Sequence, residues 1–374
     1  MSIEALRAQI DATDERILEL LNERATLAVA IGHAKRAAHA PGADNKQGAE
    51  KLLRDPERER AVLDRLAALA KGQFPQQAVR AVFREIMSGC LSLEQPLHVA
   101  FLGPEGTFTQ MAARYLFGLS AQYREAATIE GVFDAVRTGD AALGVVAIEN
   151  STEGSVTLTA DLLIEGNVVV REELVLLIEH ALLARDSVPF SSVQRVYSHP
   201  QALAQCRGWL TKNLPGAQLV QTASTTAAAR QALLDTAGAA VASPLAAELH
   251  GLQILRERIQ DRTENATRFV VLGKEDAPRT GRDRTSLAFS VKDQRGALRR
   301  VLSAFEDEGV NLSRLESRPS QQKPWDYVFL VDLEGHRTDE TVQRALENLR
   351  SSCDMVKVLG SYARRDPIRL TSIP

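Results

Sequence analysis

Hydrophobic residues in the first part of the chain recur with the spacing of α-helices. Over residues 3–36 the apolar positions stand three or four residues apart, which predicts one long helix. The same period predicts a second helix over 56–70 and a third over 76–94, and the stretch HAPGADNKQGAE is loop-like in composition. One long helix and two shorter ones cannot easily enclose a core. We therefore expect this segment to pair with a second copy of itself.

From residue 97 the pattern changes to short β-rich runs that alternate with helical stretches. The predicted helices include 200–211 and 225–234, which lie between runs of buried-strand character. The runs are LHVAFL, LGVVAI, VQRVYS, AQLVQT, GAAVAS and RFVVLG. This alternation is typical of an α/β fold in which helices cover a mainly parallel sheet.

The last 90 or so residues follow a third pattern, after the polar linker KEDAPRTGRDR. Their order is strand, helix, strand, strand, helix, strand, which is the ferredoxin-like α+β arrangement. The sequence thus predicts a multidomain protein with an all-α domain at 1–95, an α/β domain at 97–274 and an α+β domain at 284–362.

Composition narrows the classes of protein. With 44% hydrophobic and 25% charged residues the chain resembles a soluble globular protein, and a net charge of −3 gives no reason to expect nucleic acid as a partner. No signal peptide and no run of about 18 apolar residues is found, so no membrane span is expected. Cys90, Cys206 and Cys353 are far apart and lack the spacing of metal ligands. We expect a reduced, cytoplasmic protein without disulfides, metal or cofactor.

Two cations of the first helix can act together. Arg24 and Lys35 are separated by 11 positions, which returns to nearly the same face about 16 Å further along the helix. Arg7 lies about 100° off that face, but it can reach the site of an antiparallel partner copy. From spacing alone, solvated helix charges remain the alternative.

Hydroxyl and amide residues follow several predicted strands of the α/β segment. Such residues stand in VVAIENSTEGS, VYSHPQALAQC and QTASTTAAA, at strand ends where ligands of open α/β sheets bind. They indicate a small polar ligand, although each is also an ordinary helix cap. His199 is either a general base or a structural hydrogen-bonding residue.

The stretch TENATRFVVL joins a polar loop to an apolar run that predicts a buried strand. In a regular strand Thr267 and Arg268 face opposite sides. Both reach one ligand only if the regular strand begins at about Phe269.

The first segment resembles the all-helical chorismate mutase domain in LRAQIDATDERILELLNERATLAVAIGHAK, DPERERAVL and IMSGCLSLE. The resemblance implies an intertwined homodimer in which each long first helix lends an Arg to the other subunit's site. A Claisen rearrangement is unimolecular, so such a site needs only to hold a compact conformer and stabilise charge on the ether oxygen. The residues implied to bind chorismate are Arg7, Arg24, Lys35, Asp55, Glu59, Cys90 and Glu94.

Two of these positions depart from the family pattern. Cys90 stands where the family often has Ser, and Glu94 stands where some members have a Gln that donates to the ether oxygen. Because a Glu donates only when protonated, we expect mutase activity to fall as the pH rises through the pKa of Glu94. The loop 37–54 is longer than is usual in the family, which weakens the match at Asp55.

Residues 97–274 resemble the prephenate dehydratase domain in five ordered motifs, FLGPEGTFTQ, VAIENSTEGSV, VYSHPQALAQC, STTAAA and NATRFVVL. The resemblance implies two α/β lobes, similar to periplasmic binding proteins, with prephenate between them. It makes Thr267 the catalytic candidate, as a proton relay or a hydrogen-bond donor to the leaving hydroxyl. The implied prephenate-binding residues are Glu149, Asn150, Ser151, Ser198, Gln205, Ser224, Thr225, Thr267 and Arg268.

The C-terminal segment resembles the ACT domain in RGALRRVL and LESRPS. The resemblance implies L-phenylalanine bound between two paired ACT domains and feedback on the dehydratase. A helix cap and an edge strand are the alternative from these residues alone. The implied phenylalanine-binding residues are Gly296, Ala297, Leu298, Glu316, Ser317 and Arg318.

Together the three resemblances imply a bifunctional enzyme of phenylalanine biosynthesis. It converts chorismate to prephenate and then prephenate to phenylpyruvate. Two alternatives stay open at this point. One is an amino-acid-sensing binding protein without catalysis, and the other is an enzyme with one active and one degenerate domain, for which Cys90 and the long loop are the hints.

Overall fold

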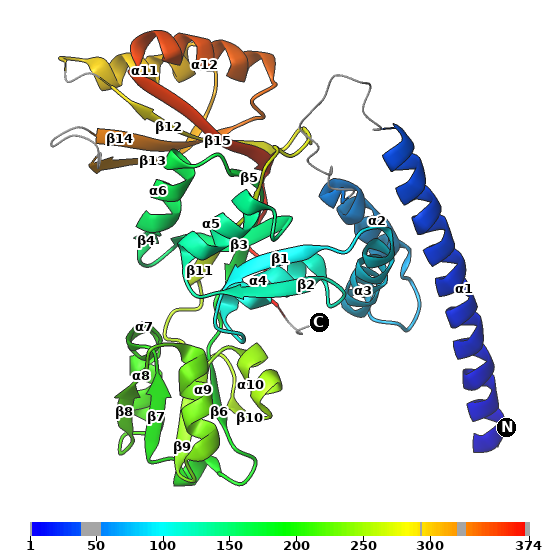
Figure 1. Cartoon of the computed structure of the whole chain (residues 1–374). Helices are drawn as coiled ribbons and strands as arrows, with labels where there is room; N and C mark the ends of the chain where they lie inside the picture. The colour runs from blue at the N-terminus through cyan, green and yellow to red at the C-terminus, as the bar shows by residue number, and fades with distance from the viewer. Residues whose placement is uncertain (1, 39–53, 292–293, 320–326, 371–374) are drawn as a thin grey trace. The chain divides into compact units, whose positions relative to one another are not determined.

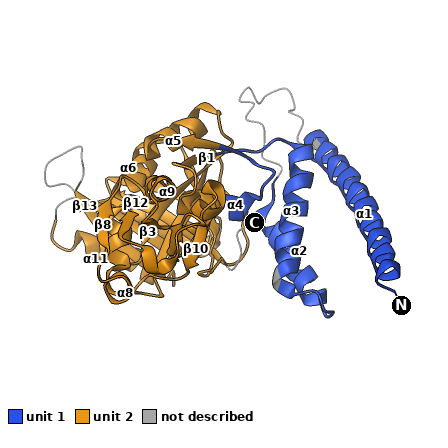
Figure 2. Cartoon of the chain, turned by 90° about the horizontal axis from the view of Figure 1, so that it is seen from below, with its two compact units in different colours: residues 1–99, 114–123, 374 blue, residues 100–113, 124–373 orange. Residues whose placement is uncertain are grey.

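The computed structural model describes residues 2–38, 54–291, 294–319 and 327–370. It divides into two compact units, shown in Figure 2. The first comprises residues 1–99 and 114–123, and the second comprises residues 100–113 and 124–373. The loop predicted over 37–54 lies almost wholly outside the described residues.

The first unit contains the three predicted helices, α1 (Ile3–Ala38), α2 (Pro56–Leu69) and α3 (Gln76–Glu94). Helix α1 contacts α3 near its C-terminal end, where the Arg36 guanidinium donates to the Glu94 carbonyl oxygen over 2.8 Å. A Cβ at Gly32 would stand 3.1 Å from the Glu94 side chain, so glycine permits this close approach. Apolar side chains remain exposed along the rest of α1, namely Ile3, Leu6, Ile10, Ile17, Leu18, Leu20, Leu27 and Ile31.

The second unit contains three sheets with helices against them (Figure 1). The first sheet has the order β2-β1-β3-β11-β5, and the short strand β4 pairs with β3. Its strands are β1 (His98–Leu102), β2 (Gln122–Ala126), β3 (Leu143–Asn150), β4 (Gly154–Ser155), β5 (Val169–Leu177) and β11 (Ala266–Gly273). Its helices are α4 (Phe108–Phe117), α5 (Ile129–Thr138) and α6 (Thr157–Glu165).

The second sheet has the order β10-β6-β9-β7-β8. Its strands are β6 (Ala181–Ala184), β7 (Arg195–Ser198), β8 (Gln218–Gln221), β9 (Gly238–Ala242) and β10 (Gln253–Arg256). The neighbouring helices are the 3-10 turn η1 (Phe190–Ser192), α7 (Pro200–Gln205), α8 (Arg207–Asn213), α9 (Thr225–Leu234) and α10 (Pro244–His250). The chain crosses between the two sheets twice, from β5 to β6 and from β10 to β11.

The expectation of a mainly parallel sheet needs one correction in each of these two sheets, namely a strand that runs against both of its neighbours. Strand β11 runs antiparallel to both β3 and β5, and β6 runs antiparallel to β9 and β10, while β7 is parallel to β8 and β9. The sequence patterns did not indicate β2, β5, β6 and β10. Strands β2 and β10 expose about every second residue, and short runs of this kind are ambiguous by periodicity alone.

A third sheet, of order β13-β14-β12-β15, follows in the same unit. Its strands are β12 (Asp283–Ser290), β13 (Leu312–Pro319), β14 (Tyr327–Glu334) and β15 (Met355–Ala363). The helices that accompany it are α11 (Ala297–Glu306) and α12 (Glu340–Ser352). One apolar core joins it to the first sheet, because Leu330 and Tyr362 pack in the same cluster as Val146 and Val270. A Cβ at Gly360 would lie 2.2 Å from the Val170 carbonyl oxygen, so only glycine lets β15 approach β5 so closely.

Candidate active site

A cavity of about 580 Å³ lies between the first and second sheets of the second unit, and we call it the main cavity. The first sheet lines it with the ends of β3 and β11, and the other side is lined by α7 and the start of α9. Its polar lining residues are Thr107, Thr109, Asn150, Glu153, Ser155, His180, His199, Gln201, Gln205, Ser224, Thr225, Asn265 and Thr267.

The antiparallel pairing of β11 with β3 explains how two distant motifs meet in this cavity. The start of β11 lies beside the end of β3, so that Thr267 pairs with Asn150 across the two strands. The Asn150 side-chain Nδ2 donates to Thr267 Oγ1 over 2.9 Å. The segments VVAIEN and NATRF therefore form one site, although more than 100 residues separate them.

Thr267 is nine-tenths buried and presents its hydroxyl to the main cavity. A Thr hydroxyl has one proton to donate and two lone pairs that accept. One lone pair accepts from Asn150, and no acceptor for the proton is found among the residues that the structure describes. The proton is thus available to a molecule bound in the cavity.

Two helices begin at the wall of the main cavity. Helix α9 is capped by Ser224, whose hydroxyl accepts from the backbone N–H of Ala227 over 3.0 Å, and Thr225 follows as its first residue. Helix α4 begins at Phe108, between the lining residues Thr107 and Thr109. Unpaired N–H groups at such helix starts favour bound anions. No Lys or Arg is among the lining residues that the structure describes.

Four residues predicted to bind the same ligand do not line the main cavity: Glu149, Ser151, Ser198 and Arg268. Ser198 is fully buried and donates to the Val241 carbonyl oxygen over 2.6 Å. The Ser151 hydroxyl accepts from the backbone N–H of Ala266 over 2.9 Å and so holds the entry to β11. These two side chains support the fold around the cavity.

Glu149 and Arg268 face away from the cavity because side chains alternate along a strand. The regular strand begins at Ala266, not at Phe269, so Thr267 and Arg268 point to opposite sides. This geometry corrects the expectation that Arg268 contacts the same ligand as Thr267. The Arg268 guanidinium instead lies 3.5 Å from the Glu149 carboxylate, its neighbour in the strand register.

Arg268 is the centre of a buried charge cluster that reaches the third sheet. Its guanidinium bonds the carboxylates of Glu173 over 2.8 Å and Asp332 over 2.6 Å, and it donates to the Tyr362 hydroxyl over 2.6 Å. Arg284 also bonds Glu173 over 2.6 Å, so two cations face two carboxylates. The third sheet is thereby anchored directly behind the strand that carries Thr267.

His180 and Asn265 are among the lining residues that the sequence interpretation missed. The His180 ring Nε2 lies 2.8 Å from Gln205 Oε1, and Asn265 Nδ2 donates to the same oxygen over 3.2 Å. His180 follows a strand that was not predicted. Asn265 stands two positions before Thr267. This spacing was the one feature of the sequence that could have indicated its place beside Thr267 at the cavity.

In the first unit, Glu94 lies within electrostatic reach of Arg24, Lys35 and Arg36. Partial burial raises the pKa of Glu94 above its ordinary value, and the positive charges of Lys35, Arg36 and Arg24 oppose that rise only in part. Glu94 Oε2 is buried and has no hydrogen-bond partner among the described residues. The direction of the shift favours the protonated carboxyl more than in an ordinary glutamate.

The other chorismate-binding candidates occupy separate places in the first unit. Asp55 caps α2 by accepting from the backbone N–H of Arg58 over 3.0 Å, and Glu59 forms a 3.0 Å ion pair with Arg54. Cys90 is buried on α3. Arg7 is exposed near the start of α1, roughly 25 Å along the helix from Arg24.

The C-terminal candidates divide into two groups. Gly296 has a φ of +76° and starts α11, with Ala297 buried and Leu298 half-buried behind it. On the edge strand β13, Ser317 is exposed.

The two neighbours of Ser317 contact the first-sheet region. Glu316 accepts from the hydroxyl of Ser155, which lines the main cavity. Arg318 donates to the Thr157 carbonyl oxygen and pairs with Asp161, both over 2.8 Å. The strand that carries these residues is therefore attached to the wall of the cavity.

Comparisons with known proteins agree with the three-part division. The family model described as chorismate mutase type II matches residues 6–95, that of prephenate dehydratase matches 99–277, and that of the ACT domain matches 285–351. The bifunctional chorismate mutase/prephenate dehydratase of Aquifex aeolicus is 47% identical over 367 residues, covering 97% of this chain and 98% of that protein.

Solved structures match about seven-tenths of the chain. The prephenate dehydratase of Arthrobacter aurescens in complex with L-Phe is 38% identical with a TM-score of 0.67, covering 72% of this chain and 90% of that one. GqqA, described as a novel type of quorum quenching acylase, is 33% identical with a TM-score of 0.66. The match covers 72% of this chain and 98% of that one. Among the described residues, no helix is long and apolar enough to cross a membrane. Nearly full-length similarity, which includes the helical domain, decides the assignment: the chain belongs to the family of bifunctional chorismate mutase/prephenate dehydratases.

Proposed function

We propose that this protein carries out both reactions of its family in two separate sites. The helical domain, 1–95, rearranges chorismate to prephenate, and the main cavity of the domain 97–274 converts prephenate to phenylpyruvate. The Thr267 hydroxyl, which faces the cavity with a free proton, carries the assignment of the second reaction. Supplying chorismate and prephenate separately, and following the ultraviolet absorbance of phenylpyruvate, tests both. Turnover of only one substrate would show that one domain is degenerate.

In the mutase site, we place Arg24 and Lys35 on the substrate's carboxylates and ether oxygen, with Glu94 as a hydrogen-bond donor. Asp55 and Glu59 would hold the ring hydroxyl, and Cys90 would pack beside it. Arg7 is too far along α1 to serve the same chain's site, so we assign it to the site of a second copy. The exposed apolar residues of α1 favour the intertwined homodimer that this requires.

The raised pKa of Glu94 leads to a prediction about pH. Only the protonated carboxyl can donate to the ether oxygen, so mutase kcat should be highest below this pKa and fall about tenfold per pH unit above it. The Glu94→Gln variant keeps a donor that does not titrate and should show no such fall. Steady-state assays between about pH 5 and 8 check both enzymes, and a flat profile for the unmodified enzyme would exclude this role of Glu94.

In the dehydratase site, the bond from the ring to its carboxylate breaks and CO2 leaves. The electron pair of that bond completes the aromatic ring, while the ring hydroxyl departs with its own electron pair and takes up a proton as water. Aromatisation drives the step, so the protein must chiefly assist the leaving hydroxyl. We assign this to Thr267 as a hydrogen-bond donor that faces the main cavity. The Asn150 side-chain Nδ2 fixes the Thr267 oxygen by donating a hydrogen bond to it.

The starts of α4 and α9 are suited to bind the two carboxylates of prephenate. The described lining residues include no Lys or Arg, so backbone N–H groups and the hydroxyls of Ser224 and Thr225 would bind the anion. Gln205 completes the wall opposite Thr267. GqqA shares this fold, which makes turnover of prephenate itself, rather than fold similarity, the decisive measurement.

We further assign a regulatory role to the domain 284–362, whose strand and helix order supports a ferredoxin-like ACT fold. Phenylalanine would bind at Gly296, Ala297 and Leu298, with the exposed edge of β13 completing the site against a second copy. Glu316 contacts Ser155 of the main cavity, so a shift of β13 on binding would reach the dehydratase site.

Ser317 provides the cleanest test of this regulatory site because its side chain is exposed on β13. Ser317→Ala should raise the phenylalanine concentration for half-inhibition at least about fivefold while basal dehydratase activity is unchanged. Arg318→Ala should also loosen the attachment to Asp161, so its basal activity is not expected to be preserved. Inhibition curves with Ser351→Ala as a surface control decide the point, and unchanged sensitivity of the Ser317 variant would contradict it.

A further inference from the structure

A chain of side-chain hydrogen bonds runs from Thr267 to a buried histidine that no part of the proposed mechanism uses. We propose that His180 and Asn265 are positioning residues of the dehydratase reaction. Acting through Gln205 and Asn150, they hold the Thr267 oxygen as an acceptor, so that its proton points into the main cavity. The inference deepens the proposed function, because it rests on Thr267 as the hydrogen-bond donor.

The backbone near Asn150 determines which group donates and which accepts in this chain of hydrogen bonds. The N–H groups of Thr152 and Glu153 donate to Asn150 Oδ1 over 2.9 and 3.2 Å. A backbone N–H can only donate, so the amide has one orientation and its Nδ2 must face the other way. There it donates to Thr267 Oγ1 over 2.9 Å and to Asn265 Oδ1 over 3.1 Å.

The same reasoning orients the remaining members. With its oxygen turned to Asn150, Asn265 presents Nδ2 to Gln205 Oε1 over 3.2 Å. An amide oxygen has no proton, so the His180 Nε2 that lies 2.8 Å from Gln205 Oε1 must carry one. Every group in the chain then has a single hydrogen-bonding role, from the backbone at Thr152 to the ring of His180.

The chain of hydrogen bonds connects residues from both sheets that enclose the main cavity. His180 lies on the crossover from β5 to β6, and Asn265 lies on the crossover from β10 to β11. Gln205 ends α7 beside the second sheet, and Thr267 belongs to the first. The orientation of the Thr267 hydroxyl is therefore tied to the relative position of the two walls between which the substrate would bind.

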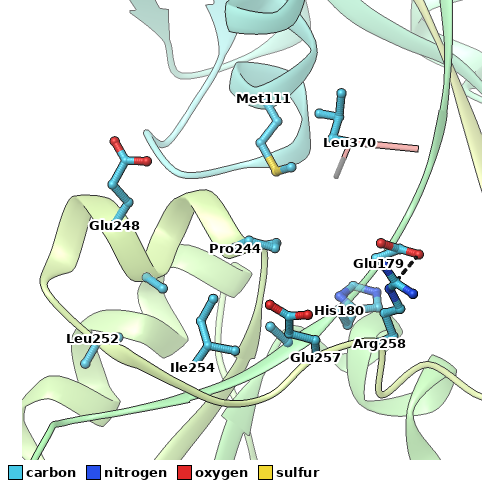
Figure 3. Close-up of a pocket in the computed structure, with 12 residues that line it drawn as sticks. Met111, Glu179, His180, Pro244, Glu248, Leu252, Ile254, Glu257, Arg258 and Leu370 are labelled. Carbon is cyan, nitrogen blue, oxygen red and sulfur yellow. Dashed lines mark ion pairs between the residues drawn. The ribbon is translucent and has the colours of Figure 1, made fainter. Parts of the chain in front are cut away.

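His180 is held more firmly than an ordinary lining residue. It is only 3% exposed, its backbone N–H donates to Gln260 Oε1 over 3.1 Å, and the Phe108 ring packs edge-on at 5.3 Å. On its other side lies a second cavity of about 410 Å³, in which Figure 3 shows His180 beside Glu179 and Arg258. Its Nδ1 is buried without a hydrogen bond among the described residues, a cost that an apolar residue would avoid.

These features separate positioning from acid–base catalysis. Burial lowers the pKa of the imidazole, and its hydrogen bond to Gln205 offsets this only in part, so the ring is neutral near pH 7. The lone pair on Nδ1 points away from the Nε2–H and has no access to solvent. His180 thus supplies a fixed donor to Gln205 and does not take a proton from the substrate.

The test compares three variants of the full-length enzyme. His180→Leu removes the donor, and Asn265→Asp keeps shape but places an acceptor against Gln205 Oε1. Each should lower dehydratase kcat about 10- to 100-fold, with a much smaller change in KM for prephenate. His180→Gln keeps an amide N–H at the same number of bonds from the backbone and should restore kcat to within a few-fold. Mutase activity of each variant reports an intact chain.

Wild-type kcat in Asn265→Asp, or equal loss in His180→Gln and His180→Leu, would overturn the inference. A further readout is the combination with Thr267→Val, in which the loss from His180→Leu should largely disappear because the hydroxyl it orients is gone. Full additivity would also overturn it. If Thr267→Val alone retains dehydratase turnover, the proposed role of Thr267 fails instead, and the two failures are thus distinguished.

Discussion

Replacement of Thr267 by Ala is expected to lower dehydratase kcat about 100- to 10,000-fold while leaving chorismate mutase activity unchanged. The range is that of losing one positioned proton or hydrogen-bond donor at a leaving group. Thr267 lines the main cavity and its hydroxyl proton has no acceptor among the described residues, so no other interaction of that proton is removed. Steady-state assays with prephenate and with chorismate measure the two activities in one preparation.

Two further variants at this position separate the hydroxyl from the shape of the side chain. Thr267→Ser keeps the hydroxyl and should retain most activity, whereas the isosteric Thr267→Val should be as impaired as Thr267→Ala. A Val variant with near wild-type turnover would show that the hydroxyl has no part in the reaction.

The reciprocal variant, Arg24→Ala, should remove most mutase activity and leave the dehydratase unchanged. Arg24 lies within electrostatic reach of Glu94 at the contact of α1 with α3, whereas Arg16 is exposed elsewhere on α1. Arg16→Ala is therefore the matched control and should retain both activities. Loss of both activities in the Thr267 or the Arg24 variant, with the fold intact, would contradict two independent sites.

Replacement of Arg268 by Met is expected to destabilise the second unit by about 3–5 kcal/mol. The guanidinium is 7% exposed and bonds Glu173 and Asp332, which are 0% and 4% exposed as side chains. Removing it leaves Asp332 buried without its ion-pair partner and Glu173 with Arg284 alone, which costs far more than the intact pair contributes. Denaturant unfolding followed by circular dichroism should show the transition of this unit at a lower concentration.

The matched control for Arg268→Met is Arg282→Met, because Arg282 bonds Asp366 at 2.7 Å with both side chains more than half exposed. Solvent screens such a pair, so its loss should leave the transition unchanged within error. Equal effects of the two substitutions would contradict the buried cluster as a source of stability.

Acid pH provides a second measure of the same cluster. Burial is the largest influence on Asp332 and alone would raise its pKa, but the charge and hydrogen bond of Arg268, together with the hydrogen bond of Ser286 and the charge of Arg314, lower the pKa overall. A carboxyl with a lowered folded pKa contributes stability that is present above its unfolded pKa and is lost as the pH falls through the folded value. The Arg268 variant should therefore lose less additional stability on acidification than the unmodified protein.

The sequence by itself determined many of the local elements, but not β2, β5, β6 and β10. Apolar spacing predicted the helices observed at 56–69, 76–94 and 225–234 to within a residue, because helical period is a local property. It also predicted the order of the last six elements. The ordered motifs identified the family that the comparisons confirm.

Only the tertiary structure decided which side chains meet. Thr267 and Asn150 face one cavity because β11 runs antiparallel to β3, and strand direction depends on contacts between distant segments. Alternation then turns Arg268 toward Asp332 of the third sheet, although it follows Thr267 in the chain. The place of His180 beside Gln205 comes from a crossover between two sheets, which no local period records.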